Sequence, residues 1–274
     1  MRFSWNVALL CGALAWFSPA ASAGQLFYDF SGGSTNVLTA IDTSTGAAHT
    51  IGTGAGYFNV YSSAFGPDGT FYAMGVDASN NPVVFTVNLS TGVGTPVGTP
   101  PASALGLQLA SDNTIYTTEN GELYKDPPGG SLTDVGPMQL GPPFMDFAMN
   151  SHGVLYAVAS IPDTTGASDI YTIDTHSGLG TLVGTLANNP CLMGIAFDKS
   201  DNLFATEYCG GPYPLYEITG LSASNPNGAT ATAIGASTTV SFQHGGDIYN
   251  APEPASLMLC LLGGVLLAAR KLHS

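Results

Sequence analysis

The sequence predicts an all-β protein, a five-bladed β-propeller of four-stranded blades that is closed by an N-terminal strand. Three observations predict it: strand-like segments recur at a regular interval, a glycine ends one strand of every repeat, and the two ends of the body supply complementary parts of one repeat. Four strands in about 45 residues are typical of a propeller blade. One repeat cannot cover its own sheet, so neighbouring repeats are expected to pack in a ring.

Each repeat begins with an apolar-alternating strand, denoted a, and continues through a turn into a short strand b. Strand a and its turn appear in "VLTAIDTSTG" and "IYTIDTHSG", and strand b appears in "HTIGT" and "TLVGT". The glycines that end the b strands are separated by 46, 38, 48 and 51 residues; they are Gly52, Gly98, Gly136, Gly184 and Gly235.

A hairpin of two further strands, c and d, completes the repeat. In each copy an apolar residue precedes an aromatic residue by seven positions, as Phe65 precedes Tyr72 in "FGPDGTFYA". Asp and Gly in the connecting segments predict tight turns, because both residue types suit turn conformations. Most acids of these segments are therefore interpreted as turn formers, namely Asp42, Asp68, Asp112, Asp174 and Asp201.

The two ends of the body predict how the ring closes. "QLFYDF" precedes the first a strand and matches the d strands, whereas "GGDIYN" near the C-terminus matches only a c strand. We therefore expect Leu26 to Phe30 to pair beside Gly246 to Asn250, which removes the open sheet edges. A β-sandwich or an incomplete ring is the alternative.

Residues 1–23 are typical of a secretory signal peptide. A basic start at Arg2 is followed by the apolar run "VALLCGALAWF" and a small-residue site that predicts cleavage between Ala23 and Gly24. An uncleaved membrane anchor is the alternative, although the run is short for a bilayer span.

Residues 252–274 form a three-part tail. Pro252, Glu253 and Pro254 precede 15 residues without a charge, and Arg270 and Lys271 follow. A helix of 15 residues is about 22 Å long, against about 30 Å for the bilayer core, so it predicts a marginal transmembrane helix. The basic pair would stay cytoplasmic, which leaves the predicted propeller domain, residues 24–251, outside.

This tail resembles the PEP-CTERM sorting signal of exported proteins of Gram-negative bacteria. The resemblance implies export across the inner membrane, a transient membrane anchor, and processing by an exosortase-type membrane enzyme, with the cell surface or extracellular matrix as destination. It also implies an exopolysaccharide-producing setting. The sequence departs from the family in having only two basic residues, Arg270 and Lys271, at its end. A plain membrane anchor is the alternative.

The charge of residues 24–251 limits the partners. This body carries 18 acidic residues, while Lys125 and Lys199 are its only strong bases, so its net charge is −16. Such a surface repels phosphate backbones, which predicts that nucleic acid is no partner. Neutral glycans, cations and basic surfaces remain, and the acidity alone would keep an exported protein soluble.

Two cysteines belong to the body, and both flank one c–d hairpin. Cys191 lies just before strand c and Cys209 just after strand d, where the open ends of an antiparallel hairpin meet. In an oxidising compartment this predicts a disulfide between them, with two free buried thiols as the alternative.

Strand direction assigns the connections to two rims. The d–a and b–c loops share one, called the loop rim, and the shorter a–b and c–d turns share the other, called the turn rim. We predict binding on the loop rim and expect the turn rim mainly to serve closure. The candidate residues are Tyr57, Phe58, Tyr61, Glu119, Glu207, Tyr208 and Tyr213. Aromatic rings stack on sugar faces and carboxylates accept hydrogen bonds from hydroxyls; alternatively, these rings seal gaps between blades.

No catalytic motif, metal-ligand spacing or cofactor motif occurs in the sequence, so no catalytic residue, metal or cofactor is predicted. We expect a non-enzymatic surface or matrix protein that binds exopolysaccharide. The alternative is an exported glycan-cleaving hydrolase or lyase, for which Glu119, Asp146, Glu207 and Asp247 are the candidate acids. Asp146 and Asp247 lie in c strands, whereas Glu119 and Glu207 end d strands, which we expect at the outer edge.

Overall fold

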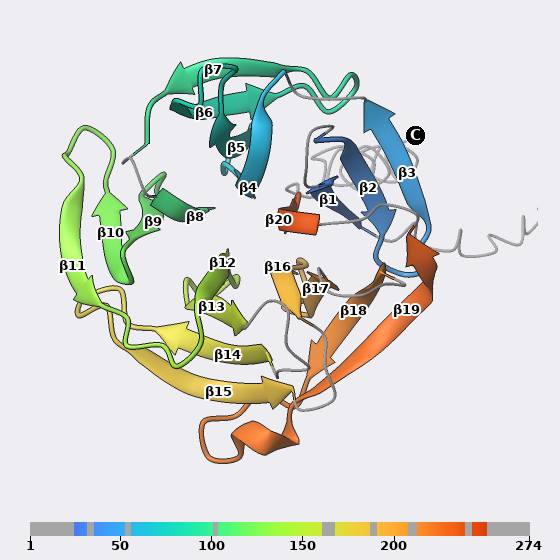
Figure 1. Cartoon of the computed structure of the whole chain (residues 1–274). Coiled ribbons are helices and arrows are strands. Elements are labelled where there is room, and N and C mark those ends of the chain that lie inside the picture. The colour runs from blue at the N-terminus through green and yellow to red at the C-terminus, as the bar shows by residue number, and fades with distance from the viewer. Residues whose placement is uncertain are drawn as a thin grey trace, which may run out of the picture.

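The computed structural model describes residues 25–31, 36–52, 56–100, 104–160, 168–186, 191–207, 213–238 and 243–250. The predicted signal peptide and the predicted sorting tail lie outside these ranges. Within them, twenty strands form five antiparallel sheets of four strands each, arranged as blades around a central axis (Figure 1). This confirms the predicted all-β, five-bladed propeller. No helix that could span a membrane occurs in this described part of the chain.

Each blade has one strand next to the axis and three strands farther out. From the axis outward, blade 1 contains β20 (Gln243–Ile248), β1 (Leu26–Ser31), β2 (Leu38–Asp42) and β3 (Ala48–Gly52). In the same order, blade 2 contains β4 (Phe58–Phe65), β5 (Phe71–Val76), β6 (Pro82–Val87) and β7 (Gly94–Gly98). Blade 3 contains β8 (Ala104–Leu109), β9 (Ile115–Glu119), β10 (Glu122–Asp126) and β11 (Thr133–Pro137).

Blade 4 contains β12 (Phe144–Met149), β13 (Leu155–Ser160), β14 (Ser168–Ile173) and β15 (Gly180–Leu186). Blade 5 contains β16 (Leu192–Phe197), β17 (Leu203–Glu207), β18 (Tyr213–Thr219) and β19 (Thr230–Thr238). A 3-10 turn, Pro226–Gly228, lies in the connection between β18 and β19.

The repeat letters map onto the blades with strand c at the axis, d second, a third and b outermost (Figure 1). The expectation that Glu119 and Glu207 lie at the outer edge is therefore wrong, because d strands lie second from the axis. The sequence order a to d does not coincide with the order across the sheet, since each blade begins with the c strand of one repeat and ends with the b strand of the next.

The predicted closure of the ring is confirmed. Strand β1 pairs antiparallel with β20, and Phe27 lies opposite Ile248. The C-terminal strand is Gln243–Ile248 rather than the predicted Gly246 to Asn250. Beyond it, the ring of Tyr249 packs 5.1 Å from that of Phe65 in blade 2, and the side chain of Asn250 donates to the carbonyl of Phe197 in blade 5.

The hydrophobic core lies between the blades. One cluster joins blades 1 and 2 through Phe30, Phe71 and Phe85, and another joins blades 1 and 5 through Phe27 and Leu215. All five side chains are fully or almost fully buried. The alternating apolar positions of the strands therefore pack blade against blade, as expected for sheets that cannot cover their own faces.

Glycines allow neighbouring blades to approach closely at the outer part of four of the five seams, as the interfaces between adjacent blades are called here. A Cβ atom added to Gly52 of β3 would overlap the carbonyl oxygen of Thr91 in the turn of blade 2, and one added to Gly235 would overlap that of Thr45. A Cβ atom added to Gly136 would overlap the carbonyl oxygen of Ser177 in the turn of blade 4, and one added to Gly184 would meet the side chains of Leu221 and Ala229 in the β18–β19 connection of blade 5. At the seam between blades 2 and 3, in contrast, a Cβ atom on Gly98 would meet nothing within 4 Å.

The turn role of the acids is confirmed for most of them. The Oδ1 atom of Asp42 accepts hydrogen bonds from the hydroxyl of Ser44 and from the backbone N–H groups of Ser44 and Thr45, and these bonds lower its pKa. Asp201 differs, because it accepts from the backbone and hydroxyl of Ser151 in the neighbouring blade, while Asp198 supports its own turn. Asp201 therefore joins blades 4 and 5 at the turn rim.

Candidate functional site

A funnel of about 340 Å³ opens along the axis at the turn rim. All five blades contribute to its wall, because each c strand ends there and leads into a turn or, for β20, into the C-terminal segment. Polar side chains in the wall include Gln108, Asn150, Asp198 and Asp247, and Tyr249 adds an aromatic ring. The expectation that this rim mainly serves closure is therefore incomplete.

Asp247 is the acidic group of the funnel that lies closest to the ring closure. It is near the end of β20, opposite Tyr28 of β1. Its Oδ2 atom accepts a hydrogen bond of 2.7 Å from the N–H of Phe65, and Oδ1 accepts one of 2.8 Å from Ile248. Burial raises its pKa to about 7, which these two backbone bonds partly oppose.

Asp146 of β12 is the second carboxylate at the axis, and it is fully buried. Its Oδ1 atom accepts a hydrogen bond of 3.2 Å from the hydroxyl of Ser62 in β4, and Oδ2 accepts one of 3.2 Å from the N–H of Ile195 in β16. Burial raises its pKa well above the usual range, and the charge of Asp247 adds to that rise. The two carboxylates are therefore near neighbours around the axis.

A third buried acid, Asp29 of β1, faces the seam with blade 5. It is 1% exposed, and no hydrogen bond of ordinary geometry reaches either carboxylate oxygen. Burial raises its pKa strongly, although Thr206 and the N–H of Phe30 lie close enough to reduce that effect. Like Asp146, it lacks the exposure that a binding residue needs.

The aromatic candidates of the loop rim have different surroundings. The ring of Tyr57 stacks on Phe85 with 4.2 Å between centroids, and Tyr61 is partly buried against the apolar cluster between blades 2 and 3. These contacts favour the alternative that both rings seal the blades. Phe58 is 41% exposed and is available at the surface.

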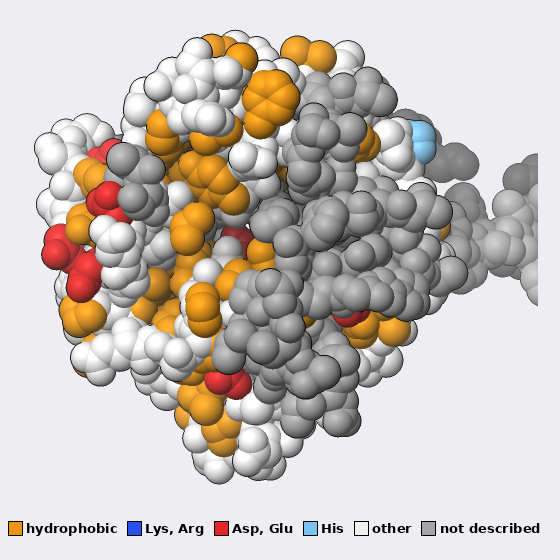
Figure 2. Space-filling model, viewed as in Figure 1, with side chains coloured by type: hydrophobic (Ala, Val, Ile, Leu, Met, Phe, Trp, Pro, Cys, Tyr) orange, Lys and Arg blue, Asp and Glu red, His pale blue; other side chains and the backbone are white. Residues whose placement is uncertain are grey.

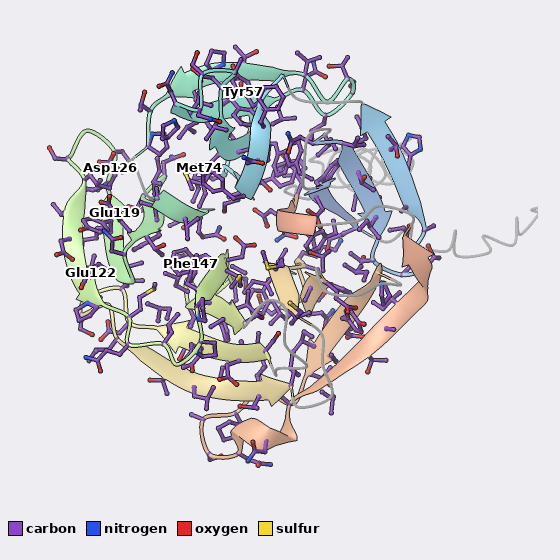
Figure 3. All side chains as sticks on the ribbon, viewed as in Figure 1. Tyr57, Met74, Glu119, Glu122, Asp126 and Phe147 are labelled. Atoms are coloured by element: carbon purple, nitrogen blue, oxygen red, sulfur yellow. The ribbon has the colours of Figure 1, made fainter. Side chains whose placement is uncertain are left out.

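The acidic candidates of the loop rim lie apart from one another. Glu207 ends β17, is only 7% exposed, and accepts a hydrogen bond of 2.7 Å from the hydroxyl of Tyr216. Burial raises its pKa. Glu119 lies in blade 3 with Glu122 and Asp126, well away from the axis (Figure 3). Neither acid therefore joins Asp146 and Asp247.

Three of the residues that the sequence analysis singled out are not described, or are described only in part. Tyr208 and Cys209 lie outside the described residues, and only the backbone of Tyr213, at the start of β18, is described. Cys191 is buried and disulfide-bonded. Its pairing with Cys209 stays a prediction. In the described ranges, no group of three or more His, Cys, Asp or Glu side chains could hold a metal ion.

The funnel is the feature that the sequence did not predict as a site. Its signal was present in the c–d hairpins, because turns that follow the innermost strands of a propeller must converge at the axis. Assigning strand c to the axis would have brought Gln108, Asn150 and Asp247 together.

The fold and the site define a five-bladed β-propeller with a polar axial funnel at its turn rim. No protein-family model matches the chain, and no curated protein matches it. A symmetrical protein studied for its de novo evolutionary emergence is similar in structure, with a TM-score of 0.54 and 18% identity over 84% of this chain and 100% of its own.

Two further structures are similar. A protein of unknown function from Bacteroides thetaiotaomicron has a TM-score of 0.50 and 13% identity, over 85% of this chain and 68% of its own. TolB from Acinetobacter baumannii has a TM-score of 0.48 and 14% identity, over 77% of this chain and 53% of its own, so this chain spans about half the length of TolB. At these identities the similarity shows the fold alone.

Proposed function

We propose that the protein is an exported, non-enzymatic surface or matrix protein that binds polysaccharide in its axial funnel. The observation that carries this proposal is the composition of the funnel wall, where amide, carboxylate and aromatic side chains from all five blades surround one opening. Such groups suit a neutral, hydroxyl-rich ligand, because they offer both donors and acceptors beside a ring that can stack. The acidic body disfavours a strongly anionic polymer.

The export part of the proposal depends on the segments that flank the propeller. The ring is closed by β1 and β20, so the five blades need no residue before Gln25 or after Asn250. In this proposal, the signal-like residues 1–23 and the tail from Pro252 act as sorting segments. We propose processing of the tail by an exosortase-type enzyme. Mass spectrometry of surface material should find no peptide from Leu257 onward; intact tail peptides would contradict this.

A matched pair of substitutions tests where polysaccharide binds. Asp247→Asn and Glu119→Gln each replace a carboxylate by an amide, the first in the funnel and the second at the loop-rim end of β9. Purified protein should bind the producing cell's polysaccharide. Asp247→Asn should weaken that binding several-fold, and Glu119→Gln should leave it unchanged.

Two results would contradict the funnel as the binding site. If Glu119→Gln or Phe58→Ala weakens binding and Asp247→Asn does not, the ligand binds at the loop rim. If the unaltered protein does not bind the polysaccharide at all, the proposed function itself is wrong. Circular dichroism and the melting temperature of each variant serve as controls for folding.

One observation favours the enzymatic alternative. The pKa of Asp247, about 7, suits a general acid or base, and the group lines an open funnel with Asp146 nearby. Against it, both oxygens of Asp146 already accept hydrogen bonds from protein groups, so this carboxylate holds strands together. Release of sugar fragments by the protein, abolished in Asp247→Asn, would favour the enzyme over the binder.

A further inference from the structure

The seam between blades 2 and 3 contains an apolar cleft of about 500 Å³. At the other four seams a glycine of the outermost strand lies against the next blade, whereas a Cβ atom added to Gly98 of β7 would meet nothing within 4 Å in the described part of the chain. Pockets of about 300–1,000 Å³ are typical of sites that bind small molecules. The volume of this cleft therefore suits a small molecule.

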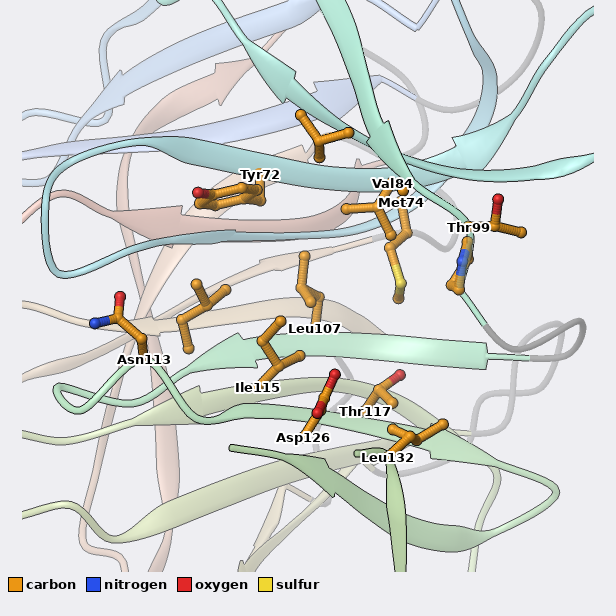
Figure 4. Close-up of a pocket in the computed structure, with 14 residues that line it drawn as sticks. Tyr72, Met74, Val84, Thr99, Leu107, Asn113, Ile115, Thr117, Asp126 and Leu132 are labelled. Atoms are coloured by element: carbon orange, nitrogen blue, oxygen red, sulfur yellow. The ribbon is translucent and has the colours of Figure 1, made fainter. Parts of the chain in front are cut away.

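Strands of both blades form the walls of the cleft (Figure 4). In blade 2, Val84 of β6 lies opposite both Met74 of β5 and Gly98 of β7, so these three positions share one face of the sheet. In blade 3, Ile115 of β9 lies opposite Asp126 of β10, and both side chains line the cleft. The walls are therefore mainly apolar, with space at Gly98 and a carboxylate at Asp126.

Asp126 stands at a position that has another role in three other blades. The residue at the end of the third strand accepts a hydrogen bond there from the backbone N–H two residues later, and these residues are Asp42, Asn88 and Asp174. In blade 3 the residue two positions after Asp126 is Pro128, which has no N–H to donate. The carboxylate of Asp126 therefore cannot support its own turn in the way that the other three side chains do.

The carboxylate of Asp126 is instead available to a ligand. Within the described residues its side chain takes part in no hydrogen bond or ion pair. Lys125 precedes it in β10, so the two side chains point to opposite faces of the sheet, and Lys125 is not among the lining residues. Asp126 is also the one charged side chain among the described lining residues. This negative charge thus belongs to the cleft itself and favours a cationic group inside it.

The cleft has polar groups at its ends and is open to solvent. Tyr72 and Asn113 lie at one end, Thr99 and Leu132 lie at the other, and Asp126 lies between them (Figure 4). Leu132 is 42% exposed, so a ligand can enter at its end. Figure 2 shows hydrophobic side chains gathered left of the centre of the molecule, beside this blade pair. An exposed apolar surface of this kind is typical of a binding site.

We propose that the cleft between blades 2 and 3 binds a small organic cation with an apolar body, of the arylalkylamine class. The ammonium group pairs with the carboxylate of Asp126, and the apolar body packs between Met74 and Ile115. The space at Gly98, which the other seams fill with a turn or connection of the next blade, admits this body. The inference is independent of what the funnel binds.

Three probes of similar shape test the chemistry of the site. Phenylbutylamine is cationic at neutral pH, phenylbutanol is neutral, and phenylbutyrate is anionic. Each is titrated against the purified protein and its binding is measured by ligand-observed NMR. We expect phenylbutylamine to bind several-fold more tightly than phenylbutanol, and phenylbutyrate to bind most weakly. Equal affinity for the amine and the alcohol, or no binding of the amine, would overturn the proposal.

A matched pair of substitutions locates the charge. Asp126→Asn and Asp134→Asn each remove one negative charge from blade 3, but Asp134 is exposed on β11 and does not line the cleft. Asp126→Asn should weaken binding of phenylbutylamine several-fold and leave that of phenylbutanol unchanged, whereas Asp134→Asn should affect neither. Equal weakening by both variants would show that only the general acidity of the protein attracts the amine, and would overturn the site.

A third variant tests the cleft without changing charge. Gly98 has no positive φ, and an added side chain there meets open space, so Gly98→Leu should fold normally and fill the cleft. It should abolish binding of both phenylbutylamine and phenylbutanol. Undiminished binding of the amine to Gly98→Leu, in a protein with an unchanged melting temperature, would show that the probe binds elsewhere and would contradict the proposal.

Discussion

The hydroxyl of Ser62 donates a hydrogen bond of 3.2 Å to Oδ1 of Asp146, and this bond joins blade 2 to blade 4. Blade 3 lies between them in the ring, so the bond joins the innermost strands of two blades that are not adjacent. The other oxygen of Asp146 accepts the N–H of Ile195 in blade 5. One buried carboxylate therefore holds the innermost strands of three blades.

Removing this carboxylate should destabilise the ring. Asp146→Ala leaves the hydroxyl of Ser62 and the N–H of Ile195 buried without their acceptor, which costs about 1–3 kcal/mol for each group. Asp146→Asn should retain more stability, because one amide oxygen remains as an acceptor. Urea unfolding of the three proteins at neutral pH measures the difference. An unfolding free energy for Asp146→Ala equal to that of the unaltered protein would show that the bonds are not important.

The buried acids also predict the pH dependence of stability. Burial raises the pKa of Asp29, Asp146 and Asp247 above the ordinary value of 3.8, and that of Asp247 reaches about 7. The folded state then binds more protons than the unfolded state, so the stabilisation is complete below about pH 4 and is lost as pH rises through the folded pKa values. The melting temperature should therefore be lower at about pH 8 than at about pH 5.

A substitution separates the contribution of Asp247 from the rest. Asp247→Asn removes the titrating group, so its melting temperature should fall less between these two pH values than that of the unaltered protein. Exposed turn acids such as Asp42 and Asp68 have lowered pKa values, and they destabilise the fold only below about pH 4. A melting temperature that rises from about pH 5 to about pH 8 would contradict the assignment.

The fold could be predicted from the sequence because its repeats are local. The glycines of the b strands, the Asp-containing turns and the complementary ends can each be recognised in a short segment, and a ring is the arrangement that covers the sheet faces of every repeat. The order of strands across a blade is harder to predict from the sequence. It depends on which strand faces the axis, and the placement of Glu119 and Glu207 at the outer edge was wrong for that reason.

The candidate site was less predictable than the fold. Exposure of Tyr57 depends on its stacking with Phe85, a contact that no local pattern records. The funnel depends on residues brought together from five repeats, with large separations in sequence. The open seam at Gly98 is also invisible in the sequence, because Gly98 ends its strand in the same way as Gly52.

These two glycines give a matched test of the seams. Neither Gly52 nor Gly98 has a positive φ, so an added methyl acts through contacts alone. Gly52→Ala would force the methyl against the carbonyl of Thr91 and should cost about 1–3 kcal/mol of unfolding free energy. Gly98→Ala should change it by less than about 0.5 kcal/mol, as for an unconstrained surface site. Equal losses in both would show that the seam at Gly98 is closed in solution.

The closure of the ring predicts unequal roles for two neighbouring residues. Phe27 of β1 is fully buried between blades 1 and 5, whereas Leu26 is 41% exposed. Phe27→Ala should destabilise the protein by about 3–5 kcal/mol, because it leaves a cavity at the strand that joins the two ends of the chain. Leu26→Ala should stay within about 0.5 kcal/mol of the unaltered protein.

Denaturant unfolding measures these energies, and size-exclusion chromatography shows whether the protein associates through an exposed strand edge. If β1 closes the ring, loosening it in Phe27→Ala exposes the unpaired side of β20, and such edges promote association. The variant should therefore form oligomers at concentrations where Leu26→Ala remains monomeric. A Phe27→Ala protein that is as stable and as monomeric as Leu26→Ala would contradict the role of β1 in closure.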